Sequence, residues 1–160
     1  MKAVYATGTN YDDPLSVLEV GTMPEPETKP FWSTIRVNSA SVNHHDVWSL
    51  QGVGLSDEQT PMILGTDAAG VLEEDIPVRK GLKAGSEVVL YTFVGTDGAG
   101  VMPGERRSIL SERYAGTMAE YTQVPSANVF AKPANLNLDE AAALGPAGLP
   151  HIPCCSHRRM

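Results

Sequence analysis

The sequence predicts a mostly β fold in a single domain. Three observations support this prediction: the chain length of 160 residues, the high content of turn-forming residues, and several short runs of apolar residues. Most domains have roughly 100–150 residues, so the chain is too short for a catalytic domain and a complete dinucleotide-binding domain together. Its 15 Gly and 12 Pro favour short strands joined by turns over long helices.

The first part of the chain predicts three strands. Residues 2–6 and 15–20 are two apolar runs separated by turn-forming residues. Residues 24–30 contain three prolines, which exclude a helix and indicate a loop. Residues 34–38 alternate polar and apolar side chains, which is typical of a half-buried strand.

A short helix is predicted over residues 44–50. Asn43 precedes it and Asp46 follows three residues later, which is the capping-box spacing with Asp in place of Glu. Gly52 and Gly54 lie just beyond the predicted helix and end it.

The second half of the chain continues as strands and ends by entering a helix. Residues 95–116 have no clear period and predict a long excursion. Asn137 and Glu140 form a second capping box in front of the apolar run 141–144, which predicts a helix start. Strands are predicted over the apolar runs 62–64, 71–72, 87–94, 118–124 and 128–131.

The charge balance and the absence of targeting signals exclude several function classes. The formal net charge is −7, and an acidic chain does not suit a nucleic-acid or anionic-membrane surface. The N-terminus lacks the apolar core of a signal peptide, and no apolar run approaches the ~20 residues of a membrane span. We therefore expect a cytoplasmic protein with a small-molecule substrate and neither a nucleic-acid nor a membrane partner.

The order of the motifs resembles the medium-chain dehydrogenase/reductase superfamily, which includes zinc alcohol dehydrogenases and quinone oxidoreductases. After an initial Met-Lys-Ala strand, the matching segments are Asn-His-His-Asp at 43–46, Leu-Gly-Thr-Asp-Ala-Ala-Gly-Val at 64–71, Gly-Ser-Glu-Val-Val at 85–89, Gly-Thr-Met-Ala-Glu-Tyr at 116–121 and Glu-Ala-Ala-Ala-Leu at 140–144. The resemblance implies a GroES-like, partly open β-barrel with a few short helices over residues 1–149. In full-length relatives a Rossmann domain follows and binds NAD(P), and we expect that domain to be absent here.

The same resemblance predicts that the chain binds no zinc. In the zinc-dependent branch a Cys stands at the position of Asn43, and a His-Glu pair stands at the positions of Thr66 and Asp67. Asn and Thr are poor zinc ligands. The excursion 95–114 also lacks the clustered cysteines of that branch. The chain is therefore similar to the zinc-independent quinone-oxidoreductase branch, whose cofactor is NADP(H) or NAD(H).

The resemblance also selects the candidate site residues. Asn43, His45 and Asp67 are the candidate catalytic residues: Asn43 for a hydrogen bond to substrate oxygen or the nicotinamide ribose, His45 for proton relay, and Asp67 as an orienting group. His44 matches the residue that faces the cofactor pyrophosphate and is the candidate cofactor contact. The alternative is that both histidines are solvent-facing residues of a helix cap and that Asn43 is only an N-cap.

Residues 150–160 do not continue the helix that Asn137 starts, because Pro150 and Pro153 interrupt it. Read one base out of frame, the codons from Leu149 permit Thr-Ala-Tyr and then a forced Leu, which is the continuation found in relatives. We therefore expect residues 150–160 to be a frameshifted tail, in which the two cysteines have no selected role. The gene's nucleotide sequence tests this expectation.

The function expected from the sequence is the substrate-side domain of a zinc-independent NAD(P)H-dependent reductase of quinones, enals or carbonyl compounds. Without the cofactor domain we expect it to be inactive alone and to bind NADPH weakly. One alternative is a free-standing binding module that self-associates or forms a homodimer through the exposed domain interface. Another is a zinc enzyme with altered ligands, the metal being held by Asp67 and His45.

Overall fold

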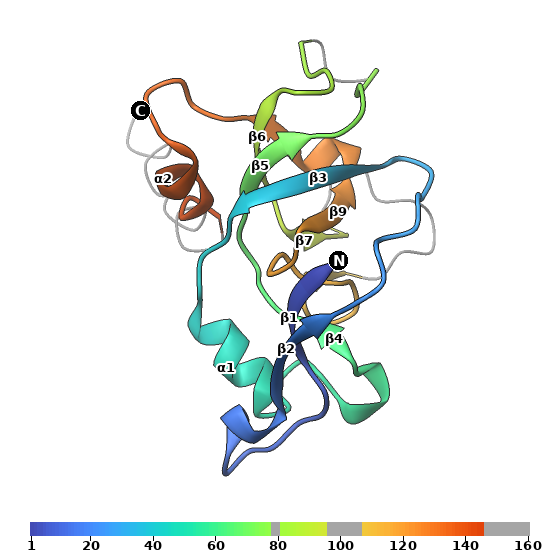
Figure 1. The fold of residues 1–160 in the computed structure, drawn as a ribbon, viewed down its shortest axis with the longest axis vertical. Coiled ribbons are helices and arrows are strands. Elements are labelled where there is room, and N and C mark those ends of the chain that lie inside the picture. The colour runs from blue at the N-terminus through green and yellow to red at the C-terminus, as the bar shows by residue number, and fades with distance from the viewer. Residues whose placement is uncertain (78–80, 96–106, 146–160) are drawn as a thin grey trace, which may run out of the picture.

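The computed structural model describes residues 1–77, 81–95 and 107–145, and it is built mainly of short antiparallel strands (Figure 1). The helices are α1 (His44–Leu50) and α2 (Leu138–Ala142), with 3-10 turns η1 (Pro14–Val17), η2 (Asp57–Gln59) and η3 (Ser126–Asn128). The strands are β1 (Lys2–Ala6), β2 (Leu18–Thr22), β3 (Trp32–Ser39), β4 (Met62–Ile63), β5 (Ala69–Leu72), β6 (Glu87–Leu90), β7 (Phe93–Val94), β8 (Ser108–Ile109), β9 (Tyr121–Pro125) and β10 (Val129–Ala131).

The largest sheet has five strands in the order β10-β6-β5-β3-β9, all antiparallel. Strand β3 pairs Ile35 with Leu72 of β5 on one side and with Thr122 of β9 on the other. Gly70 of β5 lies so close to the Arg36 carbonyl that a Cβ would collide with it. Buried side chains under this sheet form the main hydrophobic core, which includes Ile35, Leu72, Val88, Leu110, Val124 and Val129.

A second, smaller sheet places α1. Its order is β2-β1-β4, and a separate apolar cluster packs beside it, formed by Ala6, Leu50, Leu55, Met62 and Leu64. Leu50 is the last residue of α1 and is 3% exposed, so the helix is attached to the small sheet through its C-terminal end. Helix α2 instead packs on the five-stranded sheet through Ala141 and Ala142.

The structure confirms both predicted helices and the mostly β, GroES-like fold class. Helix α1 has the predicted bounds, and both capping boxes are present. The small alanines of α2 allow the helix backbone to approach the sheet closely.

Two predicted strands are wrong in detail. Residues 15–20 do not form one strand, because Pro14 begins the 3-10 turn η1 and β2 starts only at Leu18. Residues 87–94 are two strands rather than one. The Asn128 amide interrupts the ladder there by donating hydrogen bonds to the carbonyls of Tyr91 and Phe93.

Several predictions fall outside the described residues. The tail 150–160 lies there entirely, and so does half of the predicted excursion, residues 96–106, although β7 and β8 form a two-stranded ribbon at its base. Within the described ranges, no helix has the length and apolar character needed to cross a membrane.

Candidate functional site

A buried carboxylate fixes the start of α1 against the loop that follows β4. Asp46 is 4% exposed. Its Oδ2 accepts a hydrogen bond from the Asn43 amide at 2.7 Å, and its Oδ1 accepts one from the Gly65 amide at 3.0 Å. The sequence predicted the first bond as half of a capping box, but the second is a tertiary contact. Asp46 therefore holds Asn43 beside the Gly65 loop.

The Gly65 loop is held rigidly on its other side by two threonine hydroxyls. Thr92 donates to the Thr66 carbonyl at 2.6 Å, and Thr117 donates to the Asp67 carbonyl at 2.8 Å. Gly65 has φ +98°, and a Cβ there would lie 2.8 Å from the Met118 amide nitrogen. The loop thus requires glycine at this position, and its backbone presents the side chains of Thr66 and Asp67 to α1.

The side chains of Asn43, Thr66 and Asp67 form one hydrogen-bonded network. The Asn43 Nδ2 donates to Asp67 Oδ2 at 2.6 Å and to Thr66 Oγ1 at 3.1 Å. Ser41 donates to the same Asp67 oxygen at 2.7 Å. The structure therefore brings together two predicted catalytic residues, Asn43 and Asp67, in a direct side-chain hydrogen bond.

Burial raises the pKa of Asp67, and the hydrogen bonds from Asn43 and Ser41 oppose this effect. The carboxylate is 1% exposed, and its Oδ1 has no hydrogen-bond partner among the described residues. The Gly145 backbone lies against that oxygen, where a Cβ would be 2.6 Å from Asp67 Cγ. Burial likewise raises the pKa of Asp46, against the hydrogen bonds from the Asn43 and Gly65 amides.

His45 lies on the other side of Asn43 and is paired with Glu112. The distance from His45 Nε2 to Glu112 Oε1 is 3.1 Å, and both side chains are about one-fifth to one-quarter exposed, at 20% and 24%. Because a carboxylate only accepts hydrogen bonds, Nε2 is the donor in this contact. The hydroxyls of Ser49 and Ser111 face Nδ1 at 3.4 and 3.5 Å.

Glu112 is the site residue that sequence reasoning missed. It lies 67 residues after His45 in a segment without a clear period, so no local spacing connects the two. His44, the predicted cofactor contact, is exposed at the start of α1 and packs edge-on to Trp48 with a centroid distance of 5.1 Å.

These side chains border a cleft of about 450 Å³. Asn43 and Thr66 lie on one side of it and the His45–Glu112 pair on another. The described residues that line this cleft are Asn43, His44, His45, Thr66, Phe93, Ile109 and Glu112. Its lining combines hydrogen-bonding groups with two apolar side chains, and its volume lies in the range of small-molecule pockets.

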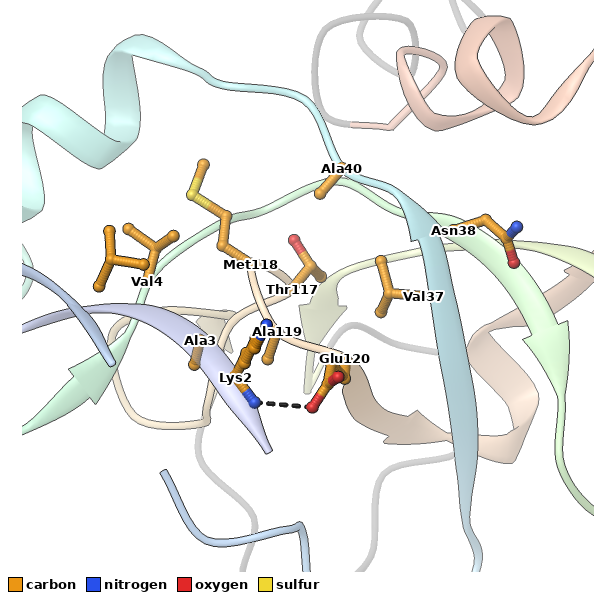
Figure 2. Close-up of a pocket in the computed structure, with 11 residues that line it drawn as sticks. Lys2, Ala3, Val4, Val37, Asn38, Ala40, Thr117, Met118, Ala119 and Glu120 are labelled. Carbon is orange, nitrogen blue, oxygen red and sulfur yellow. Dashed lines mark hydrogen bonds between the residues drawn. The ribbon is translucent and has the colours of Figure 1, made fainter. Parts of the chain in front are cut away.

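A second groove of about 400 Å³ lies away from the predicted site residues, between β1, β3 and residues 117–120 (Figure 2). Its lining is mainly apolar and includes Val4, Val37 and Met118. At its edge the Lys2 amide nitrogen donates to the Glu120 carboxylate at 2.7 Å, as the dashed line in Figure 2 shows. None of the predicted site residues is among the described residues that line it.

Comparison with known protein families shows the family to which this domain belongs. The family of alcohol dehydrogenase GroES-like domains matches residues 29–134, which include the whole site from Asn43 to Glu112. The chain belongs to this family. It is a member of the medium-chain dehydrogenase/reductase superfamily, as the motif order predicted.

Two curated relatives are reductases. Crotonyl-CoA reductase from Streptomyces avermitilis is 31% identical over 86% of this chain and 36% of its own length. The 2-methylene-furan-3-one reductase from Solanum lycopersicum is 32% identical over 74% of this chain and 28% of its own length. The GroES-like chain thus spans about a third of the length of the curated relatives it matches.

Solved structures include both metal-bound and quinone-type neighbours. An NAD-dependent alcohol dehydrogenase superposes with a TM-score of 0.73 at 38% identity, over 89% of this chain and 43% of that chain. A cobalt- and zinc-bound alcohol dehydrogenase from Pyrobaculum aerophilum gives 0.72 at 28% identity, over 90% and 44%. A quinone oxidoreductase from Coxiella burnetii gives 0.70 at 23% identity, over 98% and 44%, and shares the fold.

The residues of this GroES-like domain do not suit zinc at the Asn43–Asp67 position. Zinc in proteins takes Cys, His or carboxylate ligands in a tetrahedral set. Here the Asn43 side-chain amide donates to the Thr66 hydroxyl and to the Asp67 carboxylate. His45 is paired with Glu112 instead. In the part of the chain that the structure describes, no three His, Cys, Asp or Glu side chains are grouped to hold a metal ion.

Asp46→Ala tests the contact between α1 and the Gly65 loop. It removes the acceptor of two backbone amides, and each unsatisfied buried donor costs about 1–3 kcal/mol. We expect the free energy of unfolding in urea to fall by roughly 2–5 kcal/mol. Asp12→Ala, at an exposed position, is the control and should change it by less than about 0.5 kcal/mol. Equal effects of the two substitutions would contradict the assignment.

Asp67→Asn tests the buried carboxylate through the pH dependence of stability. Because burial raises the folded-state pKa of Asp67, the folded state binds the proton more tightly than the unfolded state. The contribution of Asp67 to the free energy of unfolding is complete below its pKa in the unfolded state. It is lost as the pH rises through its pKa in the folded state. Removing the carboxyl should therefore reduce the loss of unfolding free energy between about pH 4 and pH 7. Urea unfolding at both pH values measures this, and exposed Asp12→Asn should leave the dependence unchanged.

Proposed function

We propose that this chain is the substrate-side domain of a zinc-independent, NAD(P)H-dependent oxidoreductase that reduces quinones, enals or other carbonyl compounds. The observation that carries the proposal is the hydrogen bond from Asn43 to Asp67, which uses the space where the zinc branch has metal ligands. The curated relatives support the reaction class, because both are reductases by name. The adjoining cleft supports a small-molecule substrate.

The reduced nicotinamide, when bound, supplies the hydride. The substrate atom that receives electron density must then be stabilised by hydrogen bonds and finally protonated. His45 holds a proton at Nε2 beside the cleft, against Glu112 Oε1, and is the group proposed to deliver it. Asp67 is proposed as a positioning residue, because it holds the Asn43 amide in place at the cleft wall.

His44 is the one described residue proposed to contact the cofactor. His44 is exposed at the start of α1, and a residue that contacts a cofactor pyrophosphate must be accessible in this way. A hydride donor must be held close to the substrate for catalysis, and the relatives are about three times as long as the part this chain matches. We therefore propose that the isolated chain turns over slowly or not at all and binds NADPH weakly.

Zinc content and turnover of the 160-residue chain test the proposal together. After incubation with zinc and dialysis, elemental analysis should give well below about 0.1 zinc per chain, because Asn43 and Thr66 are poor ligands. NADPH oxidation with a quinone or an enal should stay at the rate measured without protein. One tightly bound zinc per chain would overturn zinc independence, and a robust rate would overturn the dependence on a further domain.

A second candidate function is a binding module that pairs with another copy of itself. The observation that favours it is the exposure of large apolar side chains on and beside α1: Val42 is 80% exposed, Val47 38% and Trp48 47%. Exposed apolar groups of this kind often mark protein interfaces. The occupant proposed is the same face of a second chain, since an isologous contact closes as a dimer.

Sedimentation velocity distinguishes this candidate from a monomeric domain. A self-associating face predicts a dimer at micromolar concentration, and Trp48→Ser should weaken it by at least about tenfold in dissociation constant. Val20→Ser, at a position on β2 that is 79% exposed, is the control and should leave the dimer intact. A single monomer boundary for the unmodified chain would remove this candidate.

A further inference from the structure

We propose that Glu112 is a specificity-determining residue, and that its fixed negative charge restricts the cleft to uncharged carbonyl compounds and rejects carboxylates. The inference rests on the proposed function and names the substrate class of the same cleft. Glu112 is the one carboxylate among the described residues that line this cleft.

The position of the Glu112 carboxylate is fixed from several directions. Its Oε1 is 3.1 Å from His45 Nε2, and its Oε2 accepts a hydrogen bond from the Ser108 hydroxyl at 3.0 Å. Its backbone carbonyl accepts one from the Gln59 side chain at 2.8 Å. Gly54 leaves room for the carboxylate, since a Cβ there would lie 2.9 Å from Glu112 Cδ. The side chain therefore cannot turn away to make room for an anion.

The charges around the cleft do not offset that carboxylate for an incoming anion. The described residues that line the cleft include neither Lys nor Arg. Its two titratable bases are His45, which already shares its Nε2 with Glu112, and His44, which the proposed function assigns to the cofactor. Behind Asn43 lie two further buried carboxyl groups, Asp67 and Asp46. An anion that enters this cleft would lose its hydration shell and would lie beside hydrogen-bond acceptors instead of cations, which opposes its binding.

A neutral carbonyl compound fits the same surroundings. Phe93 and Ile109 provide apolar contact for its carbon skeleton. The volume of about 450 Å³ is sufficient for a ring-sized molecule. Its oxygen needs only hydrogen-bond donors, which a neutral molecule can use without carrying a charge past Glu112.

An isosteric pair of probes separates charge from shape. 1-Acetylcyclohexene and cyclohex-1-ene-1-carboxylate share the ring and the conjugated double bond, and differ by a methyl group in place of a charged oxygen. Titration of each into the ¹⁵N-labelled 160-residue chain, followed by amide chemical shifts, gives both the dissociation constant and the place of binding. We expect the ketone to shift cleft residues such as Asn43 and Thr66, with the carboxylate binding at least about tenfold more weakly.

Glu112→Gln tests the residue itself. Glutamine keeps the shape and an acceptor oxygen but removes the charge, so the ratio of the two dissociation constants should fall from at least about tenfold to within about threefold. Glu73→Gln is the matched control, because Glu73 carries the same charge in an exposed ion pair with Arg36. The control should leave the tenfold preference unchanged.

The possible failures are distinguishable. Equal affinity of the unmodified chain for the two probes, or a preference that survives Glu112→Gln, would overturn the role of Glu112 while leaving the cleft as the substrate site. If neither probe shifts the cleft residues, the proposed function fails, and the inference fails with it.

Discussion

The candidate site depends on a single buried carboxylate, Asp46, that bonds two segments of the chain at once. It accepts hydrogen bonds from the Asn43 amide at the start of α1 and from the Gly65 amide in the loop after β4. Burial makes this arrangement demanding, because a desolvated carboxyl without both donors would be strongly unfavourable. With both donors in place, the helix start and the loop cannot move independently. Asn43 is consequently held within hydrogen-bond distance of Thr66 and Asp67.

The contact that follows, between Asn43 and Asp67, defines the chemical character of the site. In the zinc branch the corresponding positions carry metal ligands, whereas here the Asn43 amide donates to the Thr66 hydroxyl and to one oxygen of the Asp67 carboxyl. A buried carboxyl with one oxygen unpartnered among the described residues is costly, and its raised pKa reflects that cost. Such a group is retained more readily for orientation than for stability. The electrophilic part of the proposed reaction then falls to hydrogen-bond donors and His45 rather than to a metal.

Local signals predicted much of the fold correctly. The capping boxes at Asn43 and Asn137 depend only on residues three apart, and both predicted helix starts are confirmed. Alternation over residues 34–38 correctly indicated β3, because one face of that strand is buried. Of the two errors, the one over residues 15–20 has a local cause, the 3-10 turn that begins at Pro14, and the other has a neighbour distant in sequence. The strand predicted over 87–94 is divided by the side chain of Asn128, which the local pattern of those residues could not reveal.

The sequence by itself determined the family, the order of strands and helices, and the candidate residues Asn43, His44, His45 and Asp67, because each depends on local pattern or on motif order. Only the tertiary structure decided which of them act together. It joined Asn43 to Asp67 across 24 residues and His45 to Glu112 across 67, while leaving His44 exposed beside Trp48. The physical reason is that a hydrogen bond forms wherever folding brings donor and acceptor together. Glu112 is held there by the Gln59 side chain on its carbonyl and the Ser108 hydroxyl on its carboxylate, and no spacing in the sequence encodes its proximity to His45.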